Sequence, residues 1–198
     1  MSATARLDPE TILHAYSQGV FPMAEADGEI RWYTADPRGV IPLDRFHVPH
    51  SLAQFMRSAR YPYQVRVNTA FEQTMRGCMM QRFGATWISD RLIHAYLELH
   101  RMGFAHSVET WQGNVLAGGL YGVSLGGAFF GESMFHAHRD ASKCALVELV
   151  ARLRDRRFVL LDTQATTSHL VRFGCVEIPA REYLIRLRQA IELERSFV

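Results

Sequence analysis

The sequence contains few cysteines and no long apolar run. Its three cysteines, Cys78, Cys144 and Cys175, are odd in number, widely spaced and never in a Cys-x-x-Cys pair. This usage argues against a disulfide framework and against a cysteine zinc site. No stretch reaches the ~18 apolar residues of a membrane-spanning helix, and the first residues lack the apolar core of a signal peptide. We therefore expect a cytoplasmic protein that has no disulfides, metal or cofactor and does not contact a membrane.

Lysine is almost absent from the chain. All but one of the 22 basic residues are arginine, and the exception is Lys143. A compact ammonium retained at this position suggests a role that a guanidinium cannot fill, although the sequence does not reveal that role. The net charge of +2 is small, so charge alone does not identify a nucleic-acid partner.

The chain of 198 residues is long enough for one sizeable core with a small lobe attached. Residues 1–46 are predicted to form this N-terminal lobe. Asp8-Pro9-Glu10 is a strong helix start, and Gly19 supplies the stop. From Val20 to Arg45 the sequence consists of short extended pieces divided by turns, which predicts a ribbon of short strands.

Residues 47–198 are predicted to form the larger domain. Three antiparallel strands are followed by helix, strand, helix, strand and helix, which predicts an α+β fold whose mixed sheet is packed against helices. The same order occurs in the acetyltransferase-like acyl-transfer fold. The predicted helices are 51–59, 70–80, 89–102, 141–154, 166–173 and 181–194, and the predicted strands are 63–68, 106–112, 115–123, one after Gly126-Gly127, 158–164 and 175–178.

One carboxylate, Glu132, lies in the middle of an apolar run. Burying it without a partner would cost several kcal/mol. It therefore faces solvent on an edge strand, has a partner, or lines a cleft where a cationic ligand pairs with it. Glycines at 127 and 131 favour the cleft, because backbone without side chains lets a ligand approach closely.

A second polar pair, Asp162 and Gln164, ends a predicted buried strand. Because the two residues are two positions apart in a strand, their side chains should leave the same face of the sheet. Both lie at the C-terminal end of the strand, where open sheets usually bind ligands. An Asp can hold the NH₂ of a Gln and so aim the Gln carbonyl oxygen at a donor. The alternative is that Asp162 only caps the helix that begins at Thr166.

Many spaced segments in one order resemble the leucyl/phenylalanyl-tRNA–protein transferase family, from about residue 10 to 188. The matching segments are Tyr16-Ser17-Gln18-Gly19-Val20-Phe21-Pro22-Met23, Asp36-Pro37-Arg38-Gly39, Thr86-Trp87-Ile88, Gly118-Gly119-Leu120-Tyr121-Gly122, Gly131-Glu132-Ser133-Met134-Phe135, Ala141-Ser142-Lys143 and Asp162-Thr163-Gln164. The resemblance implies an enzyme that moves Leu, Phe or Met from the 3′ end of an aminoacyl-tRNA to the α-amino group of a protein beginning with Arg or Lys, marking that protein for degradation.

The resemblance also assigns roles to residues. Gln164, oriented by Asp162, would accept a hydrogen bond from the attacking amine, and Glu132 would hold the amino group of the donor residue. The terminal adenine would stack between Tyr33 and Trp87. The apolar pocket would be formed by residues that could equally be plain core, namely Leu120, Phe129, Met134, Leu149 and Leu153. Thr34-Ala35 departs from the family's usual Ser-Pro near the adenine.

Other readings remain open on the sequence alone. His136-Ala-His138 resembles a metal-binding pair but has no third ligand nearby in sequence. A coenzyme-A-dependent N-acetyltransferase would fit the order of elements, but Gly126-Gly127 leads into a strand and not into a helix. A non-catalytic module for basic N-termini, or a transferase acting on acidic N-termini, is also compatible with these residues. The acids Glu132 and Asp162 favour a basic acceptor.

Overall fold

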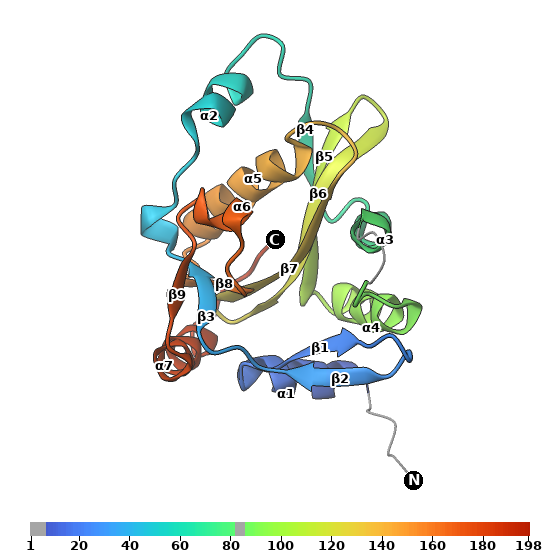
Figure 1. Cartoon of the computed structure of the whole chain (residues 1–198), viewed down its shortest axis with the longest axis vertical. Coiled ribbons are helices and arrows are strands. Elements are labelled where there is room, and N and C mark those ends of the chain that lie inside the picture. The colour runs from blue at the N-terminus through green and yellow to red at the C-terminus, as the bar shows by residue number, and fades with distance from the viewer. Residues whose placement is uncertain (1–6, 82–85) are drawn as a thin grey trace.

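The computed structural model describes residues 7–81 and 86–198 (Figure 1). Its elements follow the predicted order closely. They are α1 (Pro9–Ser17), β1 (Phe21–Ala24), β2 (Ile30–Tyr33), β3 (Arg38–Ile41), the 3-10 helix η1 (Leu43–Arg45), α2 (His50–Met56), β4 (Gln64–Val67), α3 (Phe71–Gln81), α4 (Asp90–Arg101), β5 (Ala105–Gln112), β6 (Val115–Leu125), β7 (Ala128–His136), α5 (Ala141–Asp155), β8 (Leu160–Gln164), α6 (Ser168–Val171), β9 (Val176–Ile178) and α7 (Ala180–Ile191).

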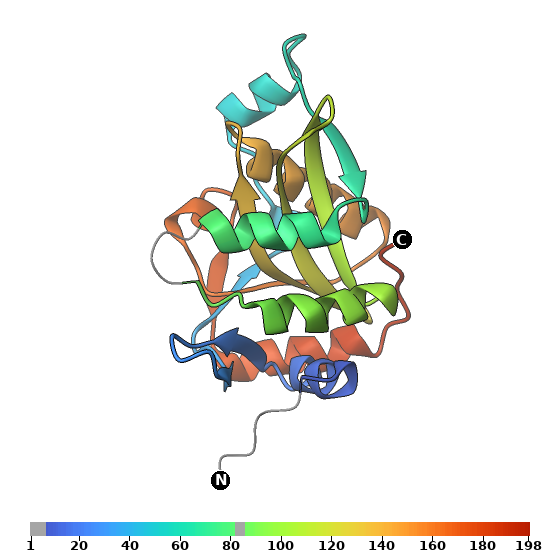
Figure 2. The same cartoon turned by 90° about the vertical axis from the view of Figure 1, so that its right-hand side faces the viewer.

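A seven-stranded sheet in the order β4-β5-β6-β7-β8-β3-β9 organises the described residues. Strands β7 and β8 pair in parallel and the other neighbours are antiparallel. Helix α5 covers one face of the sheet, and α3 and α4 cover the other (Figures 1 and 2). The predicted α+β class, with a mixed sheet, packed helices and a small N-terminal lobe, is confirmed.

The N-terminal segment contributes to two sheets. Strands β1 and β2 form a separate two-stranded sheet beside α1, whereas β3 lies inside the large sheet between β8 and β9. Strand β3 falls within the predicted lobe of residues 1–46, so the chain enters the large sheet before that boundary. The division at residue 46 stays a prediction.

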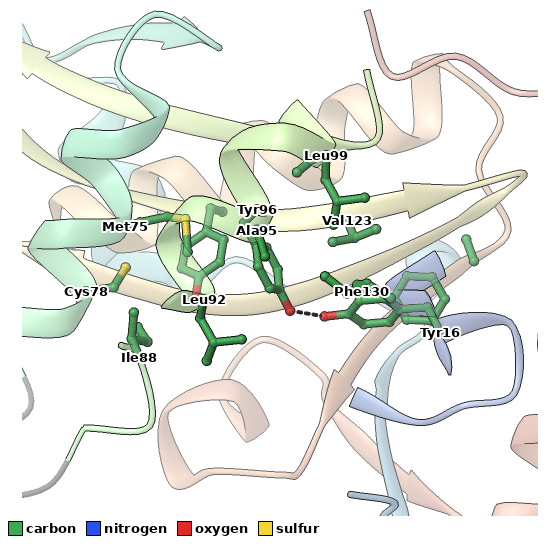
Figure 3. Packing of buried hydrophobic residues seen from close by; sticks show 14 of the residues in the cluster. Tyr16, Met75, Cys78, Ile88, Leu92, Ala95, Tyr96, Leu99, Val123 and Phe130 are labelled. Carbon is green, nitrogen blue, oxygen red and sulfur yellow. Dashed lines mark hydrogen bonds between the residues drawn. The ribbon is translucent and has the colours of Figure 1, made fainter. Parts of the chain in front are cut away.

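Each face of the sheet buries its own apolar cluster, because neighbouring residues on a strand point to opposite faces. Leu120 and Phe129 belong to the cluster under α5, while their neighbours Tyr121 and Phe130 belong to the cluster under α3 and α4. Figure 3 shows part of this second cluster, where Tyr16 of α1 meets Tyr96 of α4 beside Phe130. The lobe is therefore joined to the larger domain through a shared core.

The starts of α1, α4 and α5 differ in how they are capped. The side chains of Asp8 and Ser89 accept from backbone N–H groups of the first turns of α1 and α4, as expected of N-caps. Asp140 precedes α5 in a left-handed conformation and makes no capping bond. Its carboxylate instead pairs with Lys143 at 2.5 Å. None of the described helices is long and apolar enough to cross a membrane.

Candidate active site

The main cavity forms where two neighbouring strands stop pairing. β7 and β8 pair only from Ala128 to Phe130 on one strand and from Leu160 to Asp162 on the other. A cavity of about 460 Å³ lies beyond this paired part of the strands. It is lined by residues that follow the paired ones in each strand, Gly131 to Met134 and Thr163 to Ala165. This volume lies in the usual range for small-molecule sites.

The cavity wall is largely apolar and comes from both sides of the sheet. The large domain supplies Leu120, Tyr121, Met134, Leu146, Leu149, Leu161 and Leu170. The lobe supplies Phe21 and Met23 of β1, and Trp87 comes from the segment before α4. The backbone N–H of Ala24 donates to the carbonyl oxygen of Trp87 at 2.9 Å, which ties β1 to that segment.

Glu132 reaches the cavity from a β-bulge. Tyr121 on β6 pairs with Ser133, and the next residue, Gly122, pairs with Gly131, so Glu132 is the extra residue of β7. Bulges of this kind often re-aim a side chain beside a binding site. The half-buried Glu132 accepts from Gln164 Nε2 at 3.2 Å and from the Tyr96 hydroxyl at 3.4 Å. The structure thus supports the cleft and not the solvent-facing edge.

Burial raises the pKa of Glu132 to about 7, helped by the nearby Asp162 and opposed by the tyrosine hydroxyls and Arg38. The hydroxyl of Tyr96, which donates to Glu132, lies 2.5 Å from the hydroxyl of Tyr16; Figure 3 shows the two tyrosines together. Burial, and next to it the charge of Glu132, raises the pKa of both tyrosines well above its usual range. Both hydroxyls therefore keep their protons, and Glu132 changes charge near neutral pH.

Gln164 also follows a bulge. Gly39 of β3 pairs with Gln164 and Val40 with Asp162, which leaves Thr163 as the extra residue of β8. Gln164 then adopts a positive φ of 56°, which is uncommon outside glycine. Its side-chain NH₂ donates to Glu132, and its Oε1 has no hydrogen-bond partner among the described residues. A free carbonyl oxygen therefore remains available in the cavity.

The predicted hydrogen bond from the Gln164 side chain to Asp162 is wrong. Asp162 Oδ1 accepts from the backbone N–H of Gln164 at 2.8 Å, and Glu132 holds the side-chain amide instead. The bulge and the positive φ explain the difference, because the argument from a two-residue spacing assumes a regular strand. Asp162 is fully buried, outside the cavity wall, and paired with Arg38. The side chain of Thr167 caps the following helix α6, so helix capping is not the role of Asp162 either.

The predicted pocket residues divide between cavity and core. Leu120, Met134, Leu149 and Trp87 line the cavity. The structure does not bring Phe129 and Leu153 to it, because both are fully buried in the core between α5 and the sheet, where Phe129 stacks on Phe197. Tyr33 is also absent from the wall. It lies on β2, and its hydroxyl donates to Glu25.

Sequence reasoning gave no role to several residues that the structure brings to the site. Phe21 and Met23 line the cavity, Tyr16 and Tyr96 stand behind Glu132, and Arg38 binds Asp162. Tyr16, Phe21, Met23 and Arg38 lie in segments that match the family, which was the available signal. Arg38 had no compositional signal, because arginine supplies almost all the basic residues of this chain.

The remaining candidates lie outside the main cavity. Lys143 lines a smaller cavity of about 180 Å³ together with Arg139 and Arg172. His136 and His138 bind Gln81 and Gln112 through their Nδ1 atoms. Within residues 7–81 and 86–198, no group of three or more His, Cys, Asp or Glu side chains is placed to hold a metal ion.

Comparison with known proteins agrees with the resemblance. A model of the leucyl/phenylalanyl-tRNA protein transferase family matches residues 40–188, and a model of its N-terminal domain matches residues 5–36. The leucyl/phenylalanyl-tRNA–protein transferase of Akkermansia muciniphila is 53% identical over 190 residues, covering 94% of this chain and 97% of the relative. This chain belongs to that family. A second family protein, from Rubrobacter xylanophilus, is 51% identical over 193 residues and covers 97% of this chain and 99% of its own length.

The family models divide the chain just before β3, between residues 36 and 40. Among solved structures, L-PGS from Bacillus licheniformis superposes with a TM-score of 0.50 at 11% identity, over 93% of this chain and 70% of that chain. At that identity the likeness concerns the fold alone. It shows that the family's arrangement of sheet and helices also occurs in a protein with very different residues.

Proposed function

We propose that the cavity transfers a leucyl, phenylalanyl or methionyl residue from the 3′ end of a charged tRNA to the α-amino group of a protein that begins with Arg or Lys. Membership in the transferase family supplies the general reaction, with an aminoacyl-tRNA as donor and a protein as acceptor. The observation that carries the finer proposal is the 3.2 Å contact between Gln164 and Glu132 at the wall of an apolar cavity. The reaction would mark its product for degradation, in the cytoplasm, where charged tRNA is found.

The apolar part of the cavity suits the side chain of the donor residue. Leu120, Met134 and Leu149 present hydrocarbon and a thioether to it. Such a wall separates side chains that differ by one methylene by only ~1–3 kcal/mol. Leu, Phe and Met should therefore all be accepted to differing degrees, whereas residues with a charged side chain should be rejected because their desolvation is uncompensated.

We place the terminal adenine against Trp87, where stacking requires an aromatic face and no particular base edge. Tyr33, the other predicted partner, is not in the cavity wall, whereas Met23 and Phe21 line the cavity together with Trp87. We therefore assign the second contact with the adenine to β1. A methionine thioether packs favourably against aromatic rings, so Met23 can serve there.

The chemistry requires alignment more than activation. The aminoacyl ester of the donor is already reactive, so the enzyme must mainly hold a neutral amine against it. Because an α-amino group has a pKa near ~8, little help is needed to deprotonate it. The free Oε1 of Gln164 can accept a hydrogen bond from this amine, while its NH₂ stays on Glu132. A neutral amide keeps no proton, so Gln164 orients the amine and does not act as a true base.

Glu132 has spare acceptor capacity in the same wall. Its carboxylate receives two long hydrogen bonds, and burial holds its pKa at about 7. When ionised it can bind the ammonium group of the donor residue, and the added positive charge would in turn favour the carboxylate form. Its charge also favours a cationic acceptor over an acidic one.

The direct test is incubation of the protein with radiolabelled Leu-tRNA and peptides that begin with Arg, Lys, Asp or Glu. Label should pass to the Arg and Lys peptides. Transfer confined to the Asp and Glu peptides would overturn the acceptor specificity, and equal use of tRNAs charged with polar residues would overturn the apolar pocket. Absence of transfer to any peptide would overturn the proposed reaction itself.

A further inference from the structure

A buried cation, Arg38 on β3, connects two parts of the cavity without lining it. Only 1% of its surface is exposed. Its Nε and one terminal nitrogen donate to both oxygens of Asp162, at 2.9 and 2.6 Å, and the other terminal nitrogen donates to the carbonyl oxygen of Gly19 at 2.9 Å. Such a planar fork, with fixed donor directions, is specific to arginine.

On one side, this fork determines how Gln164 is held. Asp162 receives both Arg38 bonds, the Tyr183 hydroxyl at 2.7 Å and the backbone N–H of Gln164 at 2.8 Å. A carboxylate offers about four acceptor sites, so Asp162 is saturated and has no capacity left for substrate. Its bond to the Gln164 backbone supports the positive φ from which the side chain reaches Glu132.

On the other side, the same guanidinium holds the lobe. Gly19 lies in the short turn between α1 and β1, and Phe21 and Met23 of β1 line the cavity. The guanidinium carbon of Arg38 lies 5.1 Å from the centre of the Phe21 ring, a cation–π contact beside the bond to Gly19. The position of the β1 wall is thus fixed relative to Asp162.

We propose that Arg38 is a positioning residue that sets the β1 wall, which receives the donor nucleotide, against Gln164, which receives the acceptor amine. This assignment rests on the proposed function for the identity of the two substrates. The assignment goes beyond the proposed function because it names a residue that touches neither substrate but aligns both. The geometric part concerns only the relative placement of β1 and β8.

The charge of Arg38 also acts on Glu132. Charged and titratable groups face Glu132 from four elements: Tyr16 on α1, Tyr96 on α4, Asp162 on β8 and Arg38 on β3. Arg38 lowers the pKa of Glu132 and Asp162 raises it. Removing the guanidinium charge alone leaves the Asp162 charge uncompensated, so the pKa of Glu132 rises further. Replacing Arg38 by lysine keeps the charge and loses the fork.

These two effects separate positioning from mere stability. In Arg38→Lys we expect kcat to fall 10- to 100-fold, the loss typical of a misalignment of about 1 Å, and KM for the charged tRNA to rise, with the pH profile unchanged. In Arg38→Gln we expect the same losses. In addition, the part of the pH profile that reports ionisation of Glu132 should shift to higher pH by about half a pH unit to one pH unit. The double variant Arg38→Gln/Asp162→Asn should return this part of the pH profile toward its original pH without restoring kcat. It replaces the single Arg38→Gln variant in the test if that variant does not fold.

The matched control is Arg152→Lys on α5. Arg152 also bonds one backbone carbonyl, that of Phe197 at 2.9 Å, and lies 5.5 Å from an aromatic ring centre, but it does not line the cavity. It should keep the kcat and KM of the unmodified protein. A folded Arg38→Lys protein with unchanged kcat and donor KM, or a control that loses as much, overturns the proposal.

A crystal structure of Arg38→Lys supplies a test that does not depend on the reaction. The contact from Gln164 to Glu132 should be lost or lengthened, and Phe21 should shift relative to β8. Unchanged positions would overturn the proposal even if the unmodified protein is an active transferase. If the unmodified protein transfers no label, the proposed reaction fails, and this structure still decides whether Arg38 positions the two walls.

Discussion

The two carboxylates at the junction of β7 and β8 have opposite surroundings. Asp162 is fully buried, and its two oxygens accept four hydrogen bonds, two of them from the guanidinium of Arg38. Glu132 is half-buried in the cavity wall, with two longer bonds from neutral groups. A saturated carboxylate can only hold its neighbours, whereas an undersatisfied one can bind a cation. The site therefore separates positioning from binding along adjacent strands.

Asp162→Asn should produce the largest effect, because it attacks the saturated side. It leaves the guanidinium of Arg38 buried without a countercharge, and losing one partner of a buried pair typically costs about 3–5 kcal/mol. We expect the free energy of unfolding, measured by urea denaturation, to fall by that amount. If the free energy of unfolding fell by less than ~1 kcal/mol, the buried pair of Arg38 and Asp162 would not hold this part of the structure as described above.

Gln164→Ala should come next, through the rate and not through stability. We expect transfer to slow by about a hundredfold or more, since the interaction with the amine forms chiefly in the transition state. Folding and the KM for charged tRNA should change little. Gln112→Ala, which removes an amide outside the cavity, is the control. A Gln164→Ala protein with an unchanged rate contradicts the assignment.

Gln164→Glu sharpens the same test. A new carboxylate would stand beside Glu132, 3.2 Å from the present amide nitrogen. Like charges at this distance raise the pKa of one of the two groups. We expect partial activity with an altered pH profile, measured as kcat between pH 6 and 9. A profile identical to that of the unmodified protein would place the two side chains apart during the reaction.

Trp87→Ala should weaken donor use by about 1–3 kcal/mol, the value of one base–aromatic stack. The measurement is KM for charged tRNA or the dissociation constant of an aminoacyl-adenosine analogue. Tyr33→Ala is the control, since Tyr33 does not line the cavity. If Tyr33→Ala weakened donor binding and Trp87→Ala did not, the adenine would stack on Tyr33, as the sequence predicted, and the assignment of Trp87 would be wrong.

Glu132→Gln should have the smallest effect on stability, and with the opposite sign to Asp162→Asn. Because burial raises the pKa of Glu132 to about 7, the folded protein retains a proton that the unfolded chain releases at the ordinary value. The free energy of unfolding of the unmodified protein therefore falls as pH rises from the ordinary pKa of a glutamate to about 7. Glu132→Gln has no titrating group at this position and does not lose stability in this pH range. We expect its Tm at pH 8 to be a few °C higher.

The same variant tests the binding role of Glu132. Donor use by the unmodified protein should increase as pH rises through about 7, when the carboxylate ionises. Glu132→Gln should lose this increase and use charged tRNA poorly at pH 8. A variant that keeps the full pH dependence would show that another group titrates.

The sequence predicted the elements well because periodicity and turn residues are local. It favoured a cleft for Glu132 and predicted Gln164 at a strand end, since a charge in an apolar run and a polar strand end are visible in a short stretch. It failed where geometry departs from a regular strand. Glycines stand at both bulges, where Gly122 pairs with Gly131 and Gly39 with Gln164, but a glycine in a strand does not by itself identify the extra residue. The bulges redirect Gln164 from Asp162 to Glu132.

Other failures came from distance along the chain. Arg38 and Asp162 are 124 residues apart, so no local pattern joins them. In the sequence, Phe129 on β7 could not be told apart from Leu120 on the neighbouring β6, nor Leu153 from Leu149 on α5, because all four are apolar residues of predicted elements. Which of them faces the cavity depends on where β7 and β8 separate. Tyr33 and Met23 likewise lie on the two strands of one hairpin, and only the packed lobe shows which strand faces Trp87.

The position of β3 between β8 and β9 imposes an order on folding, because β3 is the first strand of the large sheet to be synthesised and its two neighbours are the last. A ribosome that adds ~5–20 residues per second needs roughly 6–25 s to proceed from Arg38 to Asp162, given their separation of 124 residues. During that interval β4 to β7 are made, but the guanidinium has no carboxylate to meet and β3 has neither of its neighbours. Strand β3 can therefore join the large sheet only after the C-terminal strands have been synthesised, so the two ends of the chain complete the sheet together.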